Sequence, residues 1–390
     1  MEPNRMSQPQ RAVRRYLDNA ATTWPKPAEV LAAWNRAAQD VGATAGRGFY
    51  TDAVEAEVIR RRARGAVARL LGGVDPGRVA LPSGCTLALN LAIRGLLSPG
   101  DHVIATAADH NATLRPLHRL AVGGTIDWTV VPCDAKGQVD PEEIATAWRP
   151  TTRLVVCSHV SNVTGVLQDA AAIAAVAHER SGLFLLDAAQ SLGMVAGDVS
   201  EWGCDLLAAP AHKWLLGTGG VAVLWARPGL ELEPLVAGGT GTASESLEMP
   251  EDFTASLEAG TPDVPALAAL AAAVEWHEAH GVTRTGSACR RLAVACADGL
   301  ADLAGVRIVG GEPAAPIVSF TVEGYDPAEA AVLLEQVAGV QVRSGFHCAA
   351  SIHEHLGTST SGTVRAAFGP FNTLADVEAV VQAVAMITGG

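Results

Sequence analysis

Short apolar segments alternate with helical segments along the middle of this 390-residue chain. The segment 153–159 (RLVVCSH) is β-branched and apolar, and 183–187 (LFLLD) is apolar up to its final acid. Strands of this kind, separated by helices, indicate a mostly parallel sheet with helices on both faces. We predict strands at 79–81, 102–106, 128–132, 153–159, 183–187, 205–209 and 221–225, and helices at 85–97 and 169–180.

The pattern changes after a long predicted helix at 262–279. The elements that follow are typical of a smaller α+β unit, with helices at 287–303, 327–337 and 374–387 and strands at 307–308 and 317–322. Apolar residues make up 49% of the chain and charged residues 18%, which excludes disorder as its dominant state. We predict a large α/β domain at 25–275 and a small domain that combines 1–24 with 276–390.

The charge balance bears on the class of partner. Lys and Arg total 28 against 41 Asp and Glu, and the net charge of −13 disfavours nucleic acid and anionic membranes as partners. The first fifteen residues are polar and no apolar run approaches 18 residues, so we expect neither a secretory signal nor a membrane span. The seven cysteines are odd in number and form no CxxC, which argues against a disulfide framework or structural zinc and favours the cytoplasm.

Two segments suggest a cofactor site. Lys213 lies in an apolar, glycine-rich turn (APAHKWLLGTGG) directly after a predicted strand, and a lysine whose pKa is lowered there can form a Schiff base. A lone loop lysine is more often a surface residue. Asp187 ends an apolar strand, where parallel sheets bind ligands, and can hold a pyridine nitrogen protonated. The alternative for Asp187 is a helix N-cap.

Polar residues also follow other strands. Ser83-Gly-Cys-Thr86 opens a predicted helix, so its N–H groups can bind an anion, although a plain capping turn explains it equally well. His110 follows the strand at 102–106 and can stack on a planar ring or move a proton, or it is a surface residue. His159 and Asn162 follow the next strand in HVSN.

The C-terminal segment RSGFHC places Cys348 in a loop beside His347, with Arg343 close in sequence. Such a loop can expose a thiol and favour its thiolate, whereas a buried structural cysteine is the expectation for the other six. Arg365 can bind a carboxylate through two parallel hydrogen bonds. His347, Cys348, His353 and His355 together could mimic a zinc site, but their spacing matches no standard one.

Together these segments resemble the pyridoxal-phosphate-dependent enzymes of the class V aminotransferase fold. Within that fold they are most similar to the group II (Suf-type) cysteine desulfurases and selenocysteine lyases. The resemblance runs from about Tyr16 to the C-terminus. It is carried by YLDNAATTWPKP from residue 16, AGRGFY from 45, PGDHVI from 99, HVSN from 159, LLDAAQ from 185, HKWLLGTGG from 212, GGTGTASESLE from 238, LEAGTP from 257, RSGFHCA from 343 and TVRAAFGPFNT from 363.

The resemblance implies a fold type I transferase and a set of residues for pyridoxal 5'-phosphate. Lys213 would hold the cofactor covalently, and Asp187 would pair with the ring nitrogen. Gln190 would contact the ring oxygen, and Asn162 would lie near it. His110 would stack on the ring and assist proton transfer. The phosphate would be held by Cys85, Thr86 and His212.

The resemblance also implies how substrate and partners are bound. Arg365, with Arg343 and Asn162, would bind the carboxylate of L-cysteine or a related amino acid, and Cys348 would accept its sulfur as a persulfide. Thr240 and Gly241 would reach the phosphate of the second subunit in a homodimer. A sulfur-acceptor protein and a contribution to iron–sulfur cluster assembly are further implications.

Two positions depart from the family pattern. Pro210 stands where a Ser or Thr usually donates to the phosphate, and it has neither a hydroxyl nor an N–H. Cys85 stands where a Thr is common, and a thiol is a weaker donor. These changes put the affinity for the cofactor in question rather than the type of reaction.

Three alternatives stay open from the sequence. A selenocysteine lyase would use the same residues. A class V transaminase, epimerase or C–S lyase would need Lys213 but not Cys348. A non-catalytic sulfur carrier would keep Cys348 without needing a cofactor, and the joint presence of Lys213, Asp187 and Gln190 argues against it.

Overall fold

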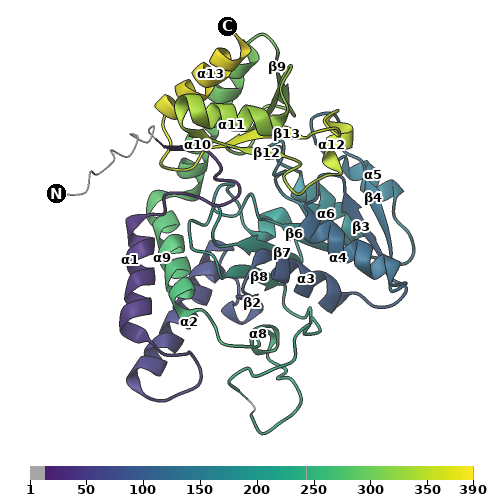
Figure 1. The fold of residues 1–390 in the computed structure, drawn as a ribbon. Coiled ribbons are helices and arrows are strands. Elements are labelled where there is room, and N and C mark those ends of the chain that lie inside the picture. The colour runs from purple at the N-terminus through teal and green to yellow at the C-terminus, as the bar shows by residue number, and fades with distance from the viewer. Residues whose placement is uncertain (1–13, 243, 390) are drawn as a thin grey trace, which may run out of the picture.

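The computed structural model describes residues 14–242 and 244–389. These residues build a seven-stranded sheet, a four-stranded sheet and a two-stranded sheet, with helices packed against them (Figure 1). The stretch 1–13, which includes most of the N-terminus interpreted above as lacking a secretory signal, lies outside the described residues. Among the helices of the described residues, none combines the length and the hydropathy that a membrane span requires.

The larger sheet has seven strands in the order β2-β8-β7-β6-β5-β3-β4. Strands β3 to β7 pair in parallel, while β8 pairs antiparallel with both β7 and β2, so the predicted mostly parallel sheet is confirmed. The bounds are β2 (Val79–Ala80), β3 (His102–Thr106), β4 (Asp127–Val131), β5 (Thr152–Ser158), β6 (Leu183–Asp187), β7 (Leu206–Pro210) and β8 (Ala222–Ala226).

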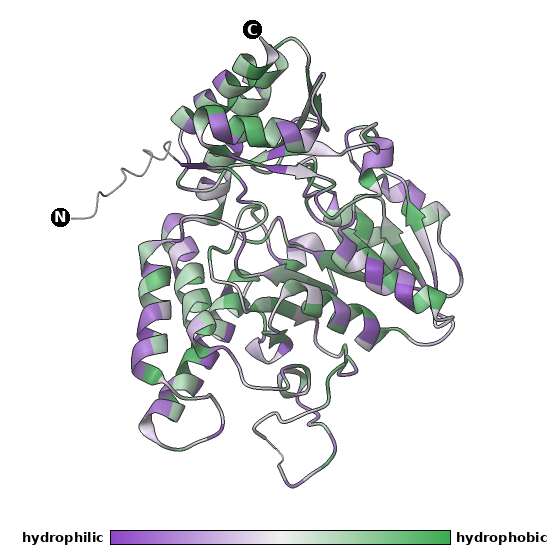
Figure 2. Cartoon of the chain, viewed as in Figure 1, coloured by the Kyte–Doolittle hydropathy of each residue, from purple (hydrophilic) through white to green (hydrophobic). Residues whose placement is uncertain are grey.

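Alternate residues of the central strands pack into different cores. Val155 and Phe184 belong to one hydrophobic cluster, whereas Leu154, Val156 and Leu185 belong to another. Since successive side chains of a strand point to opposite faces, both faces of the sheet are buried, as predicted. Figure 2 shows these strands as predominantly hydrophobic. The helices connected to this sheet are α3 (Cys85–Leu96), α4 (Asn111–Val122), α5 (Pro141–Thr146), α6 (Ala170–Glu179), α7 (Val199–Trp202) and α8 (Phe253–Leu257), with a 3₁₀ turn at Pro76–Arg78.

Three long helices pack together beside this sheet (Figure 1). They are α1 (Ala28–Arg36), which continues into a π turn at Ala37–Val41, α2 (Thr51–Leu70) and α9 (Val264–His280). No helix was predicted from sequence in the region of α1 and α2. The reason lies in the buried face of α2, which consists largely of alanines amid arginines and therefore forms no marked apolar stripe.

The smaller sheet is antiparallel, with the order β12-β13-β10-β9. Its strands are β9 (Val306–Val309), β10 (Ile317–Val322), β12 (Arg343–Gly345) and β13 (Thr363–Ala367), and its helices are α10 (Val282–Ala301), α11 (Pro327–Ala338), α12 (Ile352–His355) and α13 (Leu374–Thr388). Helix α10 starts five residues before the predicted start because only Gly281 separates it from α9. The N-terminal β1 (Arg15–Tyr16) pairs with β11 (Val340–Gln341). The domain boundaries at 24/25 and 275/276 stay a prediction.

Candidate active site

A cavity of about 360 Å³ opens where β3, β5, β6 and β7 end. Ligands of parallel sheets bind at this edge. The cavity brings together ten residues proposed from sequence, which come from segments as far apart as 85 and 365: Cys85, Thr86, His110, Asn162, Asp187, Gln190, His212, Lys213, Arg343 and Arg365.

Lys213 lies in the turn that follows β7, and hydroxyls of the N-terminal segment hold that turn. Thr23 Oγ1 donates to the Lys213 carbonyl at 2.9 Å, and Thr22 Oγ1 donates to the His212 carbonyl at 3.0 Å. The Lys26 ammonium donates to the same His212 carbonyl at 2.6 Å. Burial lowers the pKa of Lys213, while the nearby Cys85 and Asp187 act in the opposite direction. A lysine amine of lowered pKa is a better nucleophile and base near neutral pH.

Asp187 lies at the last position of β6 and is 3% exposed. Its Oδ1 accepts the Ala189 N–H at 2.9 Å. Burial raises the pKa of this carboxyl, and the adjacent Lys213 lowers it. A cation near Asp187 therefore favours its charged form, which suits a carboxylate that binds a protonated ring nitrogen.

The Gln190 amide is held at both ends. Its oxygen accepts from Trp214 Nε1 at 2.6 Å, and its Nε2 donates to the Ala20 carbonyl at 3.0 Å. Because an amide nitrogen has two hydrogens, one N–H of Gln190 is left to donate to a ring oxygen in the cavity.

The N-terminus of α3 lines the cavity. Gly84 is the N-cap and makes no side-chain capping bond, so the first N–H groups of the helix are left for a ligand. Cys85 and Thr86 line the cavity beside them, as does Pro210. Burial raises the pKa of the Cys85 thiol well above its usual value, so Cys85 can offer only a weak S–H donor.

His110 is the N-cap of α4, and its Nδ1 accepts the Ala112 N–H at 3.0 Å. Burial, followed by the charges of Lys213 and Arg343, lowers the pKa of His110 to about 4. The imidazole is therefore neutral near pH 7, and its single proton lies on Nε2 because Nδ1 accepts a bond.

Two arginines lie opposite each other on neighbouring strands of the small sheet. Arg343 of β12 pairs directly with Arg365 of β13, although like charges in opposite positions of a sheet are unfavourable. Arg365 is 1% exposed; it donates to the Asn162 carbonyl at 2.8 Å and to Asp18 Oδ1 at 2.9 Å, and its Nε is buried without a partner. Two adjacent guanidinium groups with donors to spare indicate a site for an anion such as a carboxylate.

Cys348 is exposed on the loop after β12. Both His347 and Cys348 adopt left-handed backbone conformations, with φ of 51° and 60°, which residues other than glycine rarely do. Asn162 Nδ2 holds the His347 carbonyl at 2.7 Å, and the Asn111 N–H holds the Cys348 carbonyl at 2.8 Å. The Arg343 guanidinium donates to the Cys348 sulfur at 3.6 Å.

The remaining thiols are poor nucleophiles. Burial raises the pKa of Cys133 to about 11 and those of Cys289 and Cys296 to about 12. Burial also raises the pKa values of Cys157 and Cys204. None of the seven cysteines, all of which are described, forms a disulfide.

The histidines near Cys348 have partners other than a metal. His347 Nε2 contacts Thr363 Oγ1 at 2.9 Å, and His353 contacts Thr358 Oγ1 at 2.7 Å and the Phe346 carbonyl at 3.3 Å. Within 14–242 and 244–389, no three His, Cys, Asp or Glu residues group as metal ligands would.

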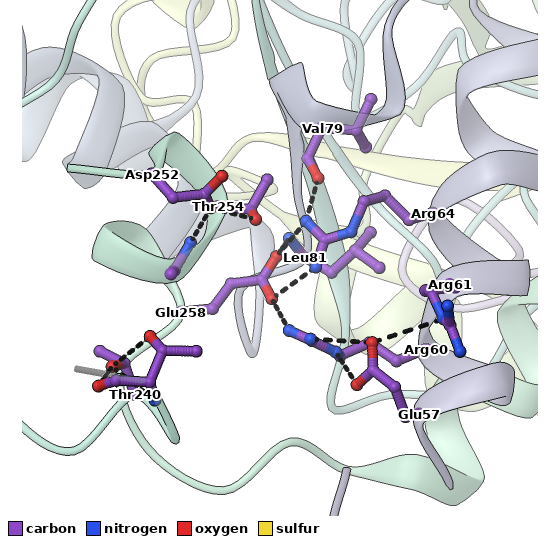
Figure 3. A network of polar contacts seen from close by, with 12 residues as sticks. Glu57, Arg60, Arg61, Arg64, Val79, Leu81, Thr240, Asp252, Thr254 and Glu258 are labelled. Carbon is purple, nitrogen blue, oxygen red and sulfur yellow. Dashed lines mark hydrogen bonds and ion pairs between the residues drawn. The ribbon is translucent and has the colours of Figure 1, made fainter. Parts of the chain in front are cut away.

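Thr240 and Gly241 do not line the cavity of their own chain. Arg47 holds the base of their loop through the carbonyls of Gly239 and Gly260. Figure 3 shows Thr240 in this loop and, nearby, the ionic network around Glu258.

The Glu258 carboxylate fastens the end of this loop to the rest of the molecule (Figure 3). It accepts two bonds from Arg64 of α2, at 3.0 and 2.9 Å, and the Leu81 N–H at 2.7 Å. Both side chains are largely buried, at 9% and 12% exposure, so this pair orients the loop more firmly than a surface ion pair would.

Several residues that position the site were not predicted from sequence. Thr22, Thr23 and Lys26 hold the Lys213 turn from a distance of about 190 residues, and no local pattern indicates this. Asp109 joins the ends of β3 and β5 by accepting the N–H groups of Thr106 at 2.7 Å and Ser158 at 2.6 Å. Burial raises the pKa of Asp109 to about 7. Its position directly before His110 was the available signal.

The sequence model of the aminotransferase class-V family matches residues 15–380. The chain belongs to the aminotransferase class-V family. Membership in this family implies pyridoxal phosphate as the cofactor. The cavity fits that group: its uncapped helix end suits a phosphate, Asp187 suits a ring nitrogen, and the partly buried Lys213 suits a covalent link.

Relatives within the class-V family match this chain over nearly its full length. A probable cysteine desulfurase of Methanothermobacter thermautotrophicus is 34% identical, over 96% of this chain and 94% of its own. The cysteine desulfurase CsdA of Escherichia coli is 31% identical, over 95% and 92%.

Solved structures of class-V relatives show the same fold. The apo cysteine desulfurase of Thermococcus onnurineus has a TM-score of 0.89 and 28% identity, covering 96% of this chain and 94% of that one. A crystal structure of CsdA from Escherichia coli has a TM-score of 0.86 and 29% identity, with the same coverage.

Proposed function

We propose that this protein is a pyridoxal-phosphate-dependent cysteine desulfurase that converts L-cysteine to L-alanine and leaves a persulfide on Cys348. The observation that carries the proposal is an exposed thiol, held in a left-handed turn beside a guanidinium group. It directly follows His347, which lines the cavity that contains Lys213 and Asp187. A transaminase needs the lysine and the carboxylate but has no use for such a thiol.

The residues that would hold pyridoxal phosphate all line the cavity. The first turn of α3, with Thr86 and His212, would bind the phosphate, and Lys213 Nζ would make the covalent link. Asp187 and Gln190 would bind the ring nitrogen and the ring oxygen. When bound, the cofactor supplies an electron-withdrawing ring that stabilises negative charge at the substrate Cα.

The protein's own side chains would carry out the rest of the reaction. Arg365 and Arg343 would bind the substrate carboxylate, which offsets the repulsion between the two guanidinium groups. Lys213, whose pKa is lowered, would take and return protons at the substrate carbon, and His110 would offer its Nε2 proton inside the cavity.

Sulfur transfer would be the task of Cys348. Its thiolate attacks the substrate sulfur, the carbon–sulfur bond breaks, and its electron pair is protonated to give the alanine methyl group. The sum is L-cysteine plus the Cys348 thiol giving L-alanine plus the Cys348 persulfide, with no other oxidant or reductant.

A homodimer belongs to this proposal. The side chains of Trp34, Phe49, Tyr50 and Val54 on α1, α2 and their connection are apolar and exposed, Phe49 fully so. Exposed apolar and aromatic side chains are typical of interaction surfaces. A second copy of the chain would cover them, with Thr240 and Gly241 near its phosphate site. Sedimentation velocity of wild type and Phe49→Ser tests this, and a monomeric wild type would contradict it.

The decisive experiment compares three amino acids. The purified protein, supplied with pyridoxal phosphate, is incubated with L-cysteine, L-selenocysteine and L-alanine, and sulfide, selenide and keto acid are measured in the presence of a reductant. We expect sulfide with L-cysteine and little keto acid with L-alanine. Selenide without sulfide would favour the selenocysteine lyase, and keto acid without sulfide would favour the transaminase.

A further inference from the structure

A second cavity, of about 490 Å³, adjoins the first on the side of α3 and α4. Arg94 of α3 and Arg115 and Arg119 of α4 line it, and Pro116 and Leu120 add apolar surface. Its volume is in the range of small-molecule sites, which combine an apolar lining with a few polar groups.

The charge of this cavity is unusual for an acidic protein. Its lining holds three arginines and no carboxylate, whereas the net charge of the chain is −13. Other arginines of this protein are paired with acids: Arg64 and Arg290 contact glutamates at 2.9 and 2.5 Å. Within the part of the chain that the structure describes, none of the ion pairs involves Arg94, Arg115 or Arg119. Unpaired guanidinium groups around a cavity favour an anionic ligand.

The thiol of Cys348 faces this second cavity rather than the first. Cys348 lines it and does not line the cavity of Lys213, while Thr86, His110 and Ala112 line both. The hydrogen bond from the Asn111 N–H to the Cys348 carbonyl, at 2.8 Å, fixes the thiol loop to the start of α4, the helix that carries two of the arginines. The thiol therefore lines the arginine-lined cavity, which shares three lining residues with the substrate cavity.

The geometry points to a binding site for a low-molecular-weight thiol that carries carboxylates, which docks on Arg94, Arg115 and Arg119 and takes the sulfane sulfur from Cys348. This inference rests on the proposed function, because it needs a persulfide on Cys348. The acceptor thiolate attacks the outer sulfur of the persulfide, the sulfur–sulfur bond breaks, and the electron pair returns to Cys348. One thiol and one persulfide give one thiol and one persulfide, so no oxidant or reductant is consumed.

The test uses three probe thiols that differ in charge: mercaptosuccinate, 2-mercaptoethanol and 2-aminoethanethiol. The holoenzyme is loaded with L-cysteine and desalted, and the second-order rate constant for loss of the Cys348 persulfide is measured for each probe, per thiolate. At low ionic strength we expect mercaptosuccinate to react about tenfold faster than 2-mercaptoethanol, and 2-aminoethanethiol to react most slowly. In about 0.5 M NaCl, where the Debye length is about 4 Å, most of this difference should vanish.

The matched variants are Arg115→Gln with Arg119→Gln, and Arg284→Gln with Arg291→Gln on the exposed face of α10 as the control. The first pair should lose roughly tenfold with mercaptosuccinate and little with 2-mercaptoethanol, because each exposed charge contact contributes modestly. The control pair should behave as wild type. Equal rates for all three probes, or equal losses in both variants, would overturn the inference.

The step that forms the Cys348 persulfide from L-cysteine distinguishes a failure of this inference from a failure of the proposed function. If L-cysteine leaves no sulfur on Cys348, the desulfurase proposal fails, and the persulfide is then made with inorganic polysulfide before the same three probes are compared. A preference for mercaptosuccinate in that case supports the acceptor site by itself, and its absence overturns the site.

Discussion

The Asn162 amide donates a 2.7 Å hydrogen bond to the carbonyl oxygen of His347, the residue before Cys348. Asn162 follows β5 of the large sheet, whereas His347 follows β12 of the small one, so this bond joins the two halves of the site. The carbonyl oxygen of Asn162 itself accepts from Arg365 at 2.8 Å. One residue therefore touches both the thiol loop and the arginine expected to bind substrate.

Replacement of Asn162 should disturb Cys348 while leaving the fold intact. Asn162→Asp places a carboxylate oxygen against the His347 carbonyl, and Asn162→Ala removes the donor, so both should loosen the strained turn. We expect the rate of persulfide formation on Cys348 to fall by about 10-fold or more. Alkylation of Cys348 by iodoacetamide should change in the same variants, and an unchanged rate in both assays would assign Asn162 to cofactor or substrate alone.

Arg365→Ala should weaken the binding of amino acids. The loss of a charge-assisted pair in a buried site costs on the order of 2–5 kcal/mol, so the KM for L-cysteine should rise by at least tenfold. Asp18 loses its 2.9 Å partner at the same time. Asp18→Asn is the control, because it breaks that ion pair and keeps the guanidinium group. If both variants raise KM equally, positioning by Asp18 rather than direct binding explains the effect.

Cys348→Ser should separate cofactor chemistry from sulfur transfer. A hydroxyl cannot accept a sulfane sulfur, so sulfide release from L-cysteine in the presence of reductant should nearly disappear while the cofactor stays bound. Turnover of L-selenocysteine can survive in part, since selenium leaves more readily. In wild type, mass spectrometry after L-cysteine should find an added sulfur on the Cys348 peptide. Full activity of the serine variant would refute the proposed mechanism.

Lys213→Ala should abolish the covalent attachment of pyridoxal phosphate. The chain has only three lysines, Lys26, Lys136 and Lys213, which makes the assignment simple. After borohydride reduction of the reconstituted wild type, the cofactor mass should be found on the Lys213 peptide and on no other. The exposed Lys136→Ala serves as the control and should keep both label and activity.

Stability should fall in mild acid, with His277 as one cause. His277 is 1% exposed, its Nε2 contacts the Trp214 carbonyl at 2.9 Å, and its Nδ1 is buried without a partner. Burial lowers the pKa of His277 to about 4, below the ~6.5 of an unfolded histidine. The unfolded state then binds a proton that the folded state does not, so stability is lost as pH falls from about 6.5 and the loss levels off below about 4.

Urea unfolding at neutral pH and in mild acid measures this effect. Between pH 7 and pH 5, this one group should reduce the free energy of unfolding by on the order of 1–2 kcal/mol. His277→Gln keeps a donor for the Trp214 carbonyl and cannot titrate, so its stability should depend less steeply on pH than that of wild type. Parallel curves for the two proteins would show that other groups dominate.

The sequence by itself determined the elements whose signal is local. Strands β3 and β6 have the predicted bounds because each is a continuous apolar run that ends at a polar residue. The positions of Asp187 and Lys213 followed from the same runs, since both residues come where a buried strand stops. Parallel strands bring their carboxyl ends to one edge of a sheet, so a shared site for these two residues could be predicted without coordinates.

Only the tertiary structure decided how the distant segments meet. The bond from Thr23 to the Lys213 carbonyl and the pairing of Arg343 with Arg365 depend on how the chain returns to the sheet edge. The left-handed backbone at Cys348 is likewise set by long-range bonds rather than by its own residue type, which disfavours that conformation. Local propensity reports the state of a few neighbouring residues, whereas these contacts depend on the packing of the whole core.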